Sequence, residues 1–146
     1  MAGVVSSRLL LGRGSVLVSV ARRVWQEGNE YAFAIVQAQD GQFLGGCGLN
    51  QINRVNRFAN LGYWVRTSQA GHGVATVAAR LLAQFGFGEL KLSRLELVID
   101  VDSQASQRVA EKLGAFREGV LRQRLFVHNQ ARDAVMSSLI PRDLKS

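Results

Sequence analysis

The hydrophobic positions between residues 74 and 85 recur with the period of an α-helix. Apolar residues stand at offsets of 0, 3, 4, 7, 8 and 11, which is one face of a helix with about 3.6 residues per turn. Glycines follow at positions 86 and 88, so a helix is predicted from Val74 to about Phe85. The stripe consists of Val74, Val77, Ala78, Leu81, Leu82 and Phe85.

Apolar runs on both sides of this helix predict β-strands. Leu95, Leu97 and Ile99 alternate with polar or exposed positions, which indicates a strand with one buried face. Asp40-Gly41 and Asn129 are turn signals between neighbouring runs. The predicted strands are Tyr31–Val36, Phe43–Ile52, Phe58–Val65, Leu92–Val101, Leu121–Val127 and Ala134–Ile140.

Two further helices are predicted. The first is Val16–Glu27, with Val16, Val20, Val24 and Trp25 on one side. The second carries Ala105, Val109 and Leu113 on one stripe, with an N-cap at Asp102-Ser103 and Gly114 just past its end. Strands on both sides of a loop and helix predict one α+β domain over residues 16–146, with a mixed, mainly antiparallel sheet. Residues 1–15 remain unassigned, because Leu9 to Leu11 fit a strand or the start of a helix.

Composition narrows the class of protein. The 146 residues are 47% hydrophobic and carry a net charge of +7, so a folded domain with acidic or phosphate-bearing partners is expected. The apolar runs are shorter than the ~18 residues of a membrane helix, and Arg13 interrupts the one near the start. We therefore expect a cytoplasmic protein without a membrane partner. Cys47 is expected to be a buried small hydrophobe, and His72 and His128 do not form a metal-ligand cluster with it.

A glycine-containing loop separates the strand ending at Val65 from the helix beginning at Val74. The first N–H groups of a helix lack internal partners, and glycine lets the backbone approach a ligand closely, so a pyrophosphate could bind over Gly71 to Thr76. A tight turn without a ligand is the alternative. The loop lacks the Lys-Ser/Thr of a Walker motif and the third glycine of a dinucleotide fingerprint.

The residues around the loop resemble a known family. Leu61-Gly62-Tyr63-Trp64-Val65, followed by Gln69-Ala70-Gly71-His72-Gly73-Val74-Ala75-Thr76, resembles the acetyl-CoA loop of the GNAT N-acetyltransferases. The family pattern has Gln or Arg where this chain has Ala70. The segments 105–115 and 117–122 resemble a second block of the ribosomal-protein alanine N-acetyltransferase branch. The resemblance spans Tyr31 to Ile140, and the opening of the family pattern is not matched.

The resemblance implies a GNAT-like fold, with the strand Phe58–Val65 splaying from Leu92–Val101 where the ligand enters. It implies acetyl-CoA as cosubstrate, with the pantetheine arm along the backbone of residues 64–66 and its thiol end near two serines of the second helix. The implied contacts are Trp64, Val65, Arg66, Gln69, Ala70, Gly71, His72, Gly73, Val74, Ala75, Thr76, Ser103 and Ser106.

Candidate catalytic residues are Glu118, Ser106 and Asn60. Asn60 stands where the family often has a carboxylate, and Ser106 resembles the serine near the CoA sulfur. Glu118 is the acidic residue nearest the usual position of the general acid, where the family has a tyrosine. Tyr31 and Tyr63 are the only tyrosines, and neither follows the second helix. A site without a strong base favours an α-amine, with a pKa of about 8, over a lysine at about 10.4.

The predicted function is acetyl transfer from acetyl-CoA to a primary amine, either a protein N-terminal α-amine or a small amine, by direct attack in a ternary complex without a metal. One alternative is a degenerate domain that binds CoA without turnover. Another is a basic RNA- or ribosome-associated module, although no stacked-aromatic signature supports nucleic acid as a partner. Whether the protein forms a homodimer stays open.

Overall fold

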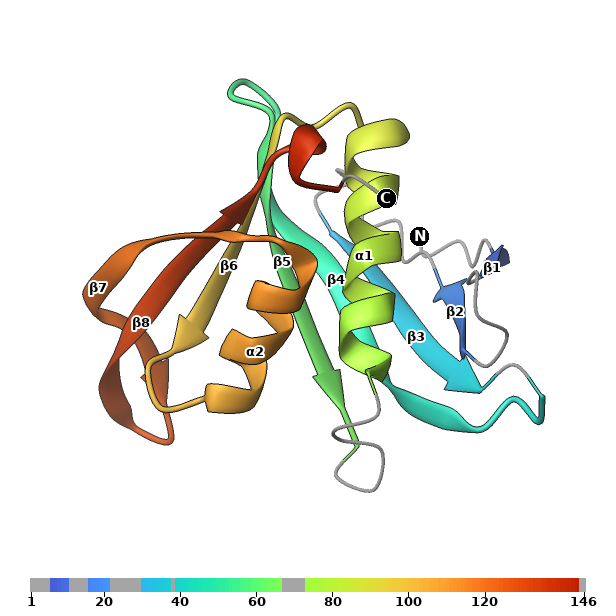
Figure 1. Cartoon of the computed structure of the whole chain (residues 1–146), viewed down its shortest axis with the longest axis horizontal. Helices are drawn as coiled ribbons and strands as arrows, with labels where there is room; N and C mark the ends of the chain where they lie inside the picture. Colours follow the sequence, from blue (N-terminus) through green and yellow to red (C-terminus); the bar gives the residue numbers. More distant parts are fainter. Residues whose placement is uncertain (1–5, 11–15, 22–29, 38, 67–72, 145–146) are drawn as a thin grey trace.

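The computed structural model describes residues 6–10, 16–21, 30–37, 39–66 and 73–144, the first two ranges by their backbone alone. These residues form one eight-stranded sheet with two α-helices and a short 3-10 helix (Figure 1). The elements are β1 Ser6–Leu10, β2 Val16–Ala21, β3 Tyr31–Gln37, β4 Phe43–Asn53, β5 Phe58–Val65, α1 Val74–Gly88, β6 Arg94–Asp100, α2 Gln104–Leu113, β7 Phe116–Val127, β8 Gln130–Leu139 and η2 Pro141–Leu144.

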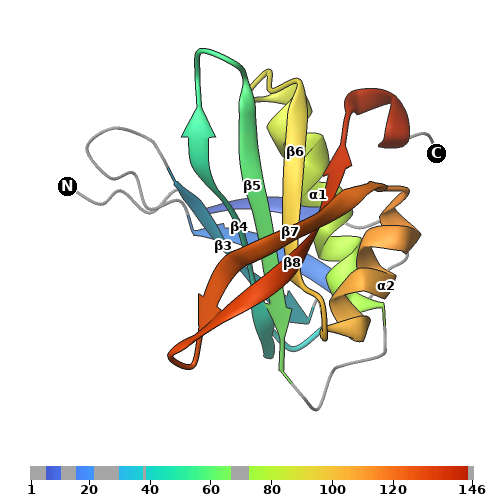
Figure 2. The same cartoon turned by 90° about the vertical axis from the view of Figure 1, so that its left-hand side faces the viewer.

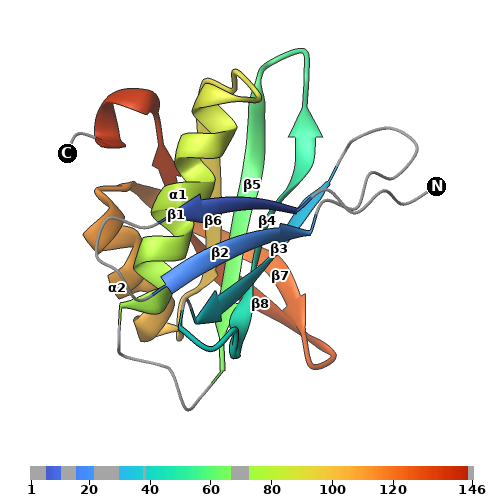
Figure 3. The same cartoon turned by 90° about the vertical axis from the view of Figure 1, so that its right-hand side faces the viewer.

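The sheet has the strand order β1-β2-β3-β4-β5-β6-β8-β7. Neighbouring strands pair antiparallel, except for β5 and β6, which pair in parallel and are joined through α1. Figures 2 and 3 show the two ends of the sheet, with β7 and β8 at one end and β1 and β2 at the other. The predicted α+β class with a mixed, mainly antiparallel sheet is confirmed.

The hydrophobic core lies between α1 and the sheet. The inner side of α1 buries Val74, Ala78, Leu81 and Leu82 as the helical period predicts, while Val77 and Phe85 are half-buried. Phe85 meets the rings of Tyr31 and Phe33 edge-on, at centroid distances of 5.6 and 5.5 Å. From the sheet, the alternate residues Leu95, Leu97 and Ile99 of β6 face this core, as predicted.

The predicted helix at Val16–Glu27 is wrong over its first part. Val16–Ala21 is strand β2, which pairs antiparallel with β3. Three alternate positions of this run, Val16, Val18 and Val20, are valines, whose branched side chains favour a strand. The four-residue spacing of Val16 and Val20 fits a helix equally well, so periodicity in so short a run could not decide. The rest of the predicted helix lies outside the described residues.

The first strand belongs to residues that the sequence left unassigned. Ser6–Leu10 forms β1 and pairs antiparallel with β2, so the sheet extends into the segment 1–15. Of the two alternatives for Leu9 and Leu10, the strand is therefore correct.

The second predicted helix and the final hairpin need small corrections. In α2 the buried residues are Ala110 and Leu113, while Ala105 is exposed. Gly114 ends the helix with φ 85°, in the left-handed conformation expected of a glycine at that place. Strand β7 begins at Phe116, before the predicted Leu121, and the turn after it has positive φ at His128 and Asn129.

The predicted splay between β5 and β6 is confirmed. Their ladder has three residue pairs and ends at Asn60 and Glu96. Beyond this point β5 stays paired with β4 up to Val65, and β6 stays paired with β8 up to Asp100. The two strands therefore part at the centre of the sheet.

Candidate functional site

A small cavity opens where β5 and β6 part. Its volume is about 190 Å³, and residues from both strands and from the start of α2 surround it. Both serines that the resemblance placed near the thiol end of CoA are among them. The lining consists of Leu61, Gly62, Tyr63, Leu97, Val98, Ile99, Asp100, Ser103 and Ser106.

A larger cleft lies beside this cavity, toward the N-terminus of α1. It measures about 570 Å³ and lies between the end of β5, the first turn of α1 and one side of α2. In Figure 1 these three elements converge at the tip of the β5 arrow. Tyr63 and Ser106 line both spaces. The other lining residues of the cleft are Trp64, Val65, Gly73, Val74, Ala75, Thr76, Ala105, Arg108, Val109 and Lys112.

The N-terminus of α1 is suited to an anion. Gly73 is the N-cap residue, with φ 74° in the left-handed region that glycine adopts readily. It offers no side-chain hydrogen bond to the helix, and the first turn has no acidic residue. The N–H groups of this turn thus lack a side-chain cap, and the helix dipole adds partial positive charge where the cleft begins. These features fit the pyrophosphate of CoA.

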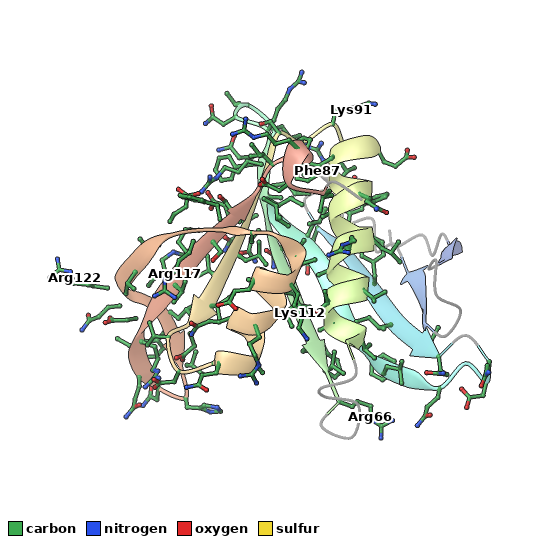
Figure 4. All side chains as sticks on the ribbon, in the orientation of Figure 1. Arg66, Phe87, Lys91, Lys112, Arg117 and Arg122 are labelled. Carbon is green, nitrogen blue, oxygen red and sulfur yellow. The ribbon has the colours of Figure 1, made fainter. Side chains whose placement is uncertain are left out.

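Two cations of α2 were missed by the sequence analysis. Arg108 and Lys112 stand one turn apart on α2 and both line the cleft. Figure 4 shows Lys112 on α2, beside α1, where Arg80 donates a hydrogen bond to the Lys112 carbonyl over 3.0 Å. The four-residue spacing from Arg108 to Lys112 on a predicted helix was the signal that could have paired them.

The end of β5 carries three of the predicted contacts. Trp64 is 56% exposed, and its ring lies 5.6 Å from that of Phe43. Trp64 and Val65 line the cleft, whereas Arg66 is not in its described lining. The Arg66 side chain instead donates to the Phe43 carbonyl over 3.2 Å. Gln69, Ala70, Gly71 and His72 lie outside the described residues.

The candidate catalytic residue Glu118 is held in an ionic cluster. Arg94 contacts Glu118 over 2.5 Å and Glu96 over 2.9 Å. Hydrogen bonds from Ser138 and Arg94 lower the pKa of Glu118. Glu118 is therefore ionised but a weak proton acceptor, and it is not in the described lining of either space.

Asn60 stands at the last pair of the β5–β6 ladder, opposite Glu96. Its side-chain amide donates to the Asn50 side chain over 2.9 Å. Asn60 is thus at the edge of the splay, yet it does not line either space in the described residues. The structure brings Ser103 and Ser106 together with the start of α1, but leaves Asn60 and Glu118 outside this group.

Tyr63 is the second feature that the sequence analysis missed. Its hydroxyl donates to the Ser106 carbonyl over 2.9 Å, and burial raises the pKa of Tyr63 to about 12. The family resemblance implies a tyrosine after the second helix. Only the fold shows that a tyrosine on β5 reaches α2.

Other reactive groups are few in the described part of the chain. Cys47 is buried as expected, and burial raises the pKa of its thiol to about 12, so it is a poor nucleophile. Over the described ranges, His, Cys, Asp and Glu side chains do not assemble into a group of three or more that could hold a metal ion. Neither α1 nor α2, nor any other described helix, is long and apolar enough to cross a membrane.

Comparison with known proteins gives a consistent result. The chain is 36% identical over 104 residues to the N-acetyltransferase YdaF of Bacillus subtilis, covering 71% of this chain and 57% of that protein. It is 30% identical to the ribosomal-protein-serine acetyltransferase of Escherichia coli, covering 72% of this chain and 58% of the relative. The chain thus spans little more than half the length of these curated relatives.

A solved structure and a family model agree with these relatives. Mycobacterium smegmatis RimJ in complex with CoA-disulfide superposes with a TM-score of 0.77 at 28% identity, covering 83% of this chain and 57% of that one. The model of the acetyltransferase (GNAT) domain matches residues 15–115, which include the cleft, the splay and α2. On this match and on the fold, the chain belongs to the GNAT acetyltransferase family.

Proposed function

We propose that this protein transfers the acetyl group of acetyl-CoA to a primary amine by direct attack in a ternary complex. The observation that carries the proposal is that the cleft and the splay adjoin each other at Tyr63 and Ser106. One end of this space is the uncapped N-terminus of α1, and the other end is the gap between β5 and β6. A long cosubstrate with phosphates at one end and a thioester at the other fits such a path.

The described residues divide the binding of CoA among themselves. The N–H groups of Gly73 to Thr76 receive the pyrophosphate. Arg108 and Lys112 add positive charge along the same cleft. The backbone of Trp64 and Val65 borders the pantetheine arm, and Ser103 and Ser106 lie near its thiol end.

The catalytic groups favour an acceptor that loses its own proton readily. Asn60 cannot accept a proton, and Glu118 has its pKa lowered by Ser138 and Arg94. At pH 7 about one α-amine in ten is neutral, against roughly one lysine side chain in a few thousand. We therefore propose an N-terminal α-amine or a small amine as acceptor. Among the relatives, a ribosomal-protein-serine acetyltransferase is consistent with a protein acceptor, and a spermidine N(1)-acetyltransferase of Escherichia coli, at 34% identity, is consistent with a small amine, although not one of low pKa.

The first test measures CoA affinity by calorimetry in the native protein and in Gly73→Asp. A carboxylate at this N-cap repels the pyrophosphate and a side chain strains the left-handed backbone, so we expect a loss of at least a hundredfold. Gly88→Asp is the matched control, because Gly88 is the last residue of the same helix and a Cβ there meets nothing within 4 Å. Equal affinities of native protein and Gly73→Asp would remove the proposal.

The second test measures acetyl transfer directly. Thiol release from acetyl-CoA is followed with a panel of peptide N-termini and small amines, and the acetylated product is identified by mass spectrometry. Product formation with at least one amine supports the enzyme. CoA binding without transfer to any amine would select a domain that binds CoA without turnover, which Asn60 and the ion-paired Glu118 favour. Salt-dependent RNA binding without CoA binding would contradict both.

A further inference from the structure

The link between β6 and α2 carries one of the two serines that line the cavity at the splay. Residues 101–103 separate the end of β6 at Asp100 from the start of α2 at Gln104, and in Figure 1 they form a short bend beyond the tip of the β6 arrow. Asp100, Ser103 and Ser106 line the cavity of about 190 Å³. The shape of this bend therefore sets where the Ser103 hydroxyl lies relative to the cavity.

Ser103 occupies the N-cap position of α2 but does not cap the helix with its side chain. A serine at this position usually accepts, through its hydroxyl, from a backbone N–H of the first turn. In α2, which is described throughout, no side-chain capping bond forms, and the Ser103 carbonyl accepts from the Gln107 N–H over 3.1 Å. The Ser103 hydroxyl is thus not committed to the helix, and it stays available to the cavity that Ser103 lines.

Gln107, one turn into α2, holds the bend with its side chain. Its amide nitrogen donates to the Val101 carbonyl over 2.8 Å and to the Asp100 carbonyl over 3.4 Å. Its amide oxygen accepts from the guanidinium of Arg117 on β7 over 3.5 Å. The reverse orientation would set the amide oxygen against two carbonyl oxygens, so these partners identify the nitrogen as the donor. The Gln107 side chain therefore ties the end of β6 to α2.

Asp100 supports the same bend from the side of the sheet. One of its carboxylate oxygens accepts from the Asp102 N–H over 2.9 Å, and its carbonyl accepts from the Ser103 N–H over 2.9 Å. The guanidinium of Arg132 on β8 donates to both carboxylate oxygens, over 3.0 and 2.9 Å, and also contacts Asp102. The backbone of the bend is thus bonded without the use of the Ser103 side chain.

We propose that Gln107 is a positioning residue for acetyl transfer, because it fixes the bend between β6 and α2 so that the Ser103 hydroxyl faces the thiol end of CoA. This inference rests on the proposed function. Asp100, held by Arg132, is the second support of the bend. A glutamine and a carboxylate satisfy the backbone that an N-cap serine would otherwise satisfy, and this leaves the serine hydroxyl for the ligand.

The test compares Gln107→Met, Ser103→Ala and the double variant. Methionine has nearly the length of glutamine and a good helix propensity, but it cannot donate to the two carbonyls. We expect kcat/KM for acetyl-CoA to fall about tenfold in each single variant, as for one lost hydrogen bond. The double variant should also lose only about tenfold, because Gln107 acts through the Ser103 hydroxyl. Gln104→Met, at an exposed glutamine of the same helix, should behave like the native protein.

A merely structural role of Gln107 predicts a different result. If Gln107 only stabilised α2, the double variant would lose about a hundredfold, the product of the two single losses, and this would overturn the inference. Native kinetics of either single variant would overturn it as well. Both results would leave the proposed function intact. Absence of CoA binding to the native protein would overturn the proposed function, and the inference with it.

Hydrogen exchange provides a readout that needs no CoA. The N–H groups of Asp102 and Ser103 are bonded to Asp100, and we expect them to exchange at least about fivefold faster in Gln107→Met, with α1 unchanged. Gln107→Glu replaces Gln107→Met in both measurements if the latter does not fold, because an ionised carboxylate of the same shape cannot donate either. Unchanged exchange at Asp102 and Ser103 in a folded variant would contradict the inference.

Discussion

Strand β5 has two edges that behave differently. Its edge toward β4 is closed, with seven residue pairs from Gly45–Val65 to Asn53–Phe58. Its edge toward β6 is closed only at Phe58, Ala59 and Asn60 and is open from there on. The same eight residues thus serve as an interior strand on one side and as the wall of a cleft on the other. A binding site can therefore arise inside a sheet where a ladder stops.

Glycine packing accounts for the closed edge. A Cβ at Gly45 would lie 2.2 Å from the Trp64 carbonyl oxygen, and one at Gly46 would lie 2.7 Å from the Trp64 side chain. At Gly45 the two backbones approach so closely that a side chain is excluded, whereas at Gly46 the Trp64 ring occupies the space. At the open edge, Gly62 shows the reverse, because a Cβ there meets nothing within 4 Å.

The largest effect is expected from breaking the closed edge. In Gly45→Ala the new methyl group clashes with backbone atoms of β5, which can yield only by shifting the strand. We expect the free energy of unfolding, measured by urea titration, to fall by about 2 kcal/mol or more. Gly62→Ala, on the facing strand, should change it by less than about 0.5 kcal/mol. Equal losses in both variants would contradict the difference between the edges.

The next prediction fills the open edge. Gly62 lines both the splay and a third cavity, of about 510 Å³ along β3, β4 and β5, and its position accepts a side chain. Gly62→Val should therefore leave stability nearly unchanged but lower kcat/KM for the amine at least tenfold, because the valine occupies the space in which the reactants meet. CoA affinity is the control and should change little. Full activity of Gly62→Val would show that the reaction does not use this space.

A smaller effect is expected at Glu118, on the far side of β6 from the open edge. Glu118→Gln should lower kcat/KM less than tenfold, since this carboxylate pairs with Arg94 and has a lowered pKa. Log kcat/KM should rise with pH along the ionisation of the acceptor, near ~8 for an α-amine, and shift with the acceptor's pKa. Glu111→Gln, an exposed residue of α2, is the control. A loss above a hundredfold with folding and CoA affinity intact would make Glu118 the base.

The smallest effect is expected from the ion pair at the end of β6, where Arg132 holds Asp100. Two Arg132–Asp100 hydrogen bonds of 3.0 and 2.9 Å lower the pKa of Asp100 from 3.8 to about 2, and Arg132 also contacts Asp102. Because the folded pKa is depressed, this contribution to stability is present above about pH 4 and is lost as the pH falls toward 2.

Arg132→Met should therefore be less stable than the native protein at neutral pH, and the difference should vanish in acid. Urea unfolding of both proteins at a series of pH values measures this difference in stability. Arg122→Met, an exposed arginine of β7 that points away from the fold in Figure 4, should show no such pH dependence. If Arg132→Met lost the same stability at every pH, the contribution of Arg132 would come from packing and not from its charge.

The sequence by itself determined the helix α1, the strands from β3 to β6, the glycine turn at Gly73 and the family. Each of these has a local cause. A 3.6-residue period spans three turns in α1, an alternating pattern runs through β6, and glycine is favoured at a positive φ such as that of Gly73. Val16–Ala21 lacked such a decisive pattern, because its hydrogen-bond partner β3 lies elsewhere in the chain and makes it a strand.

Only the tertiary structure decided which side chains share the site. Arg108 and Lys112 become part of the CoA cleft because α2 packs beside the start of α1. Glu118 pairs with Arg94 because β7 and β6 both pair with β8, and Tyr63 reaches Ser106 because β5 and β6 part. These contacts join residues far apart in sequence, so no local pattern encodes them, and their geometry follows from where the ladder between β5 and β6 ends.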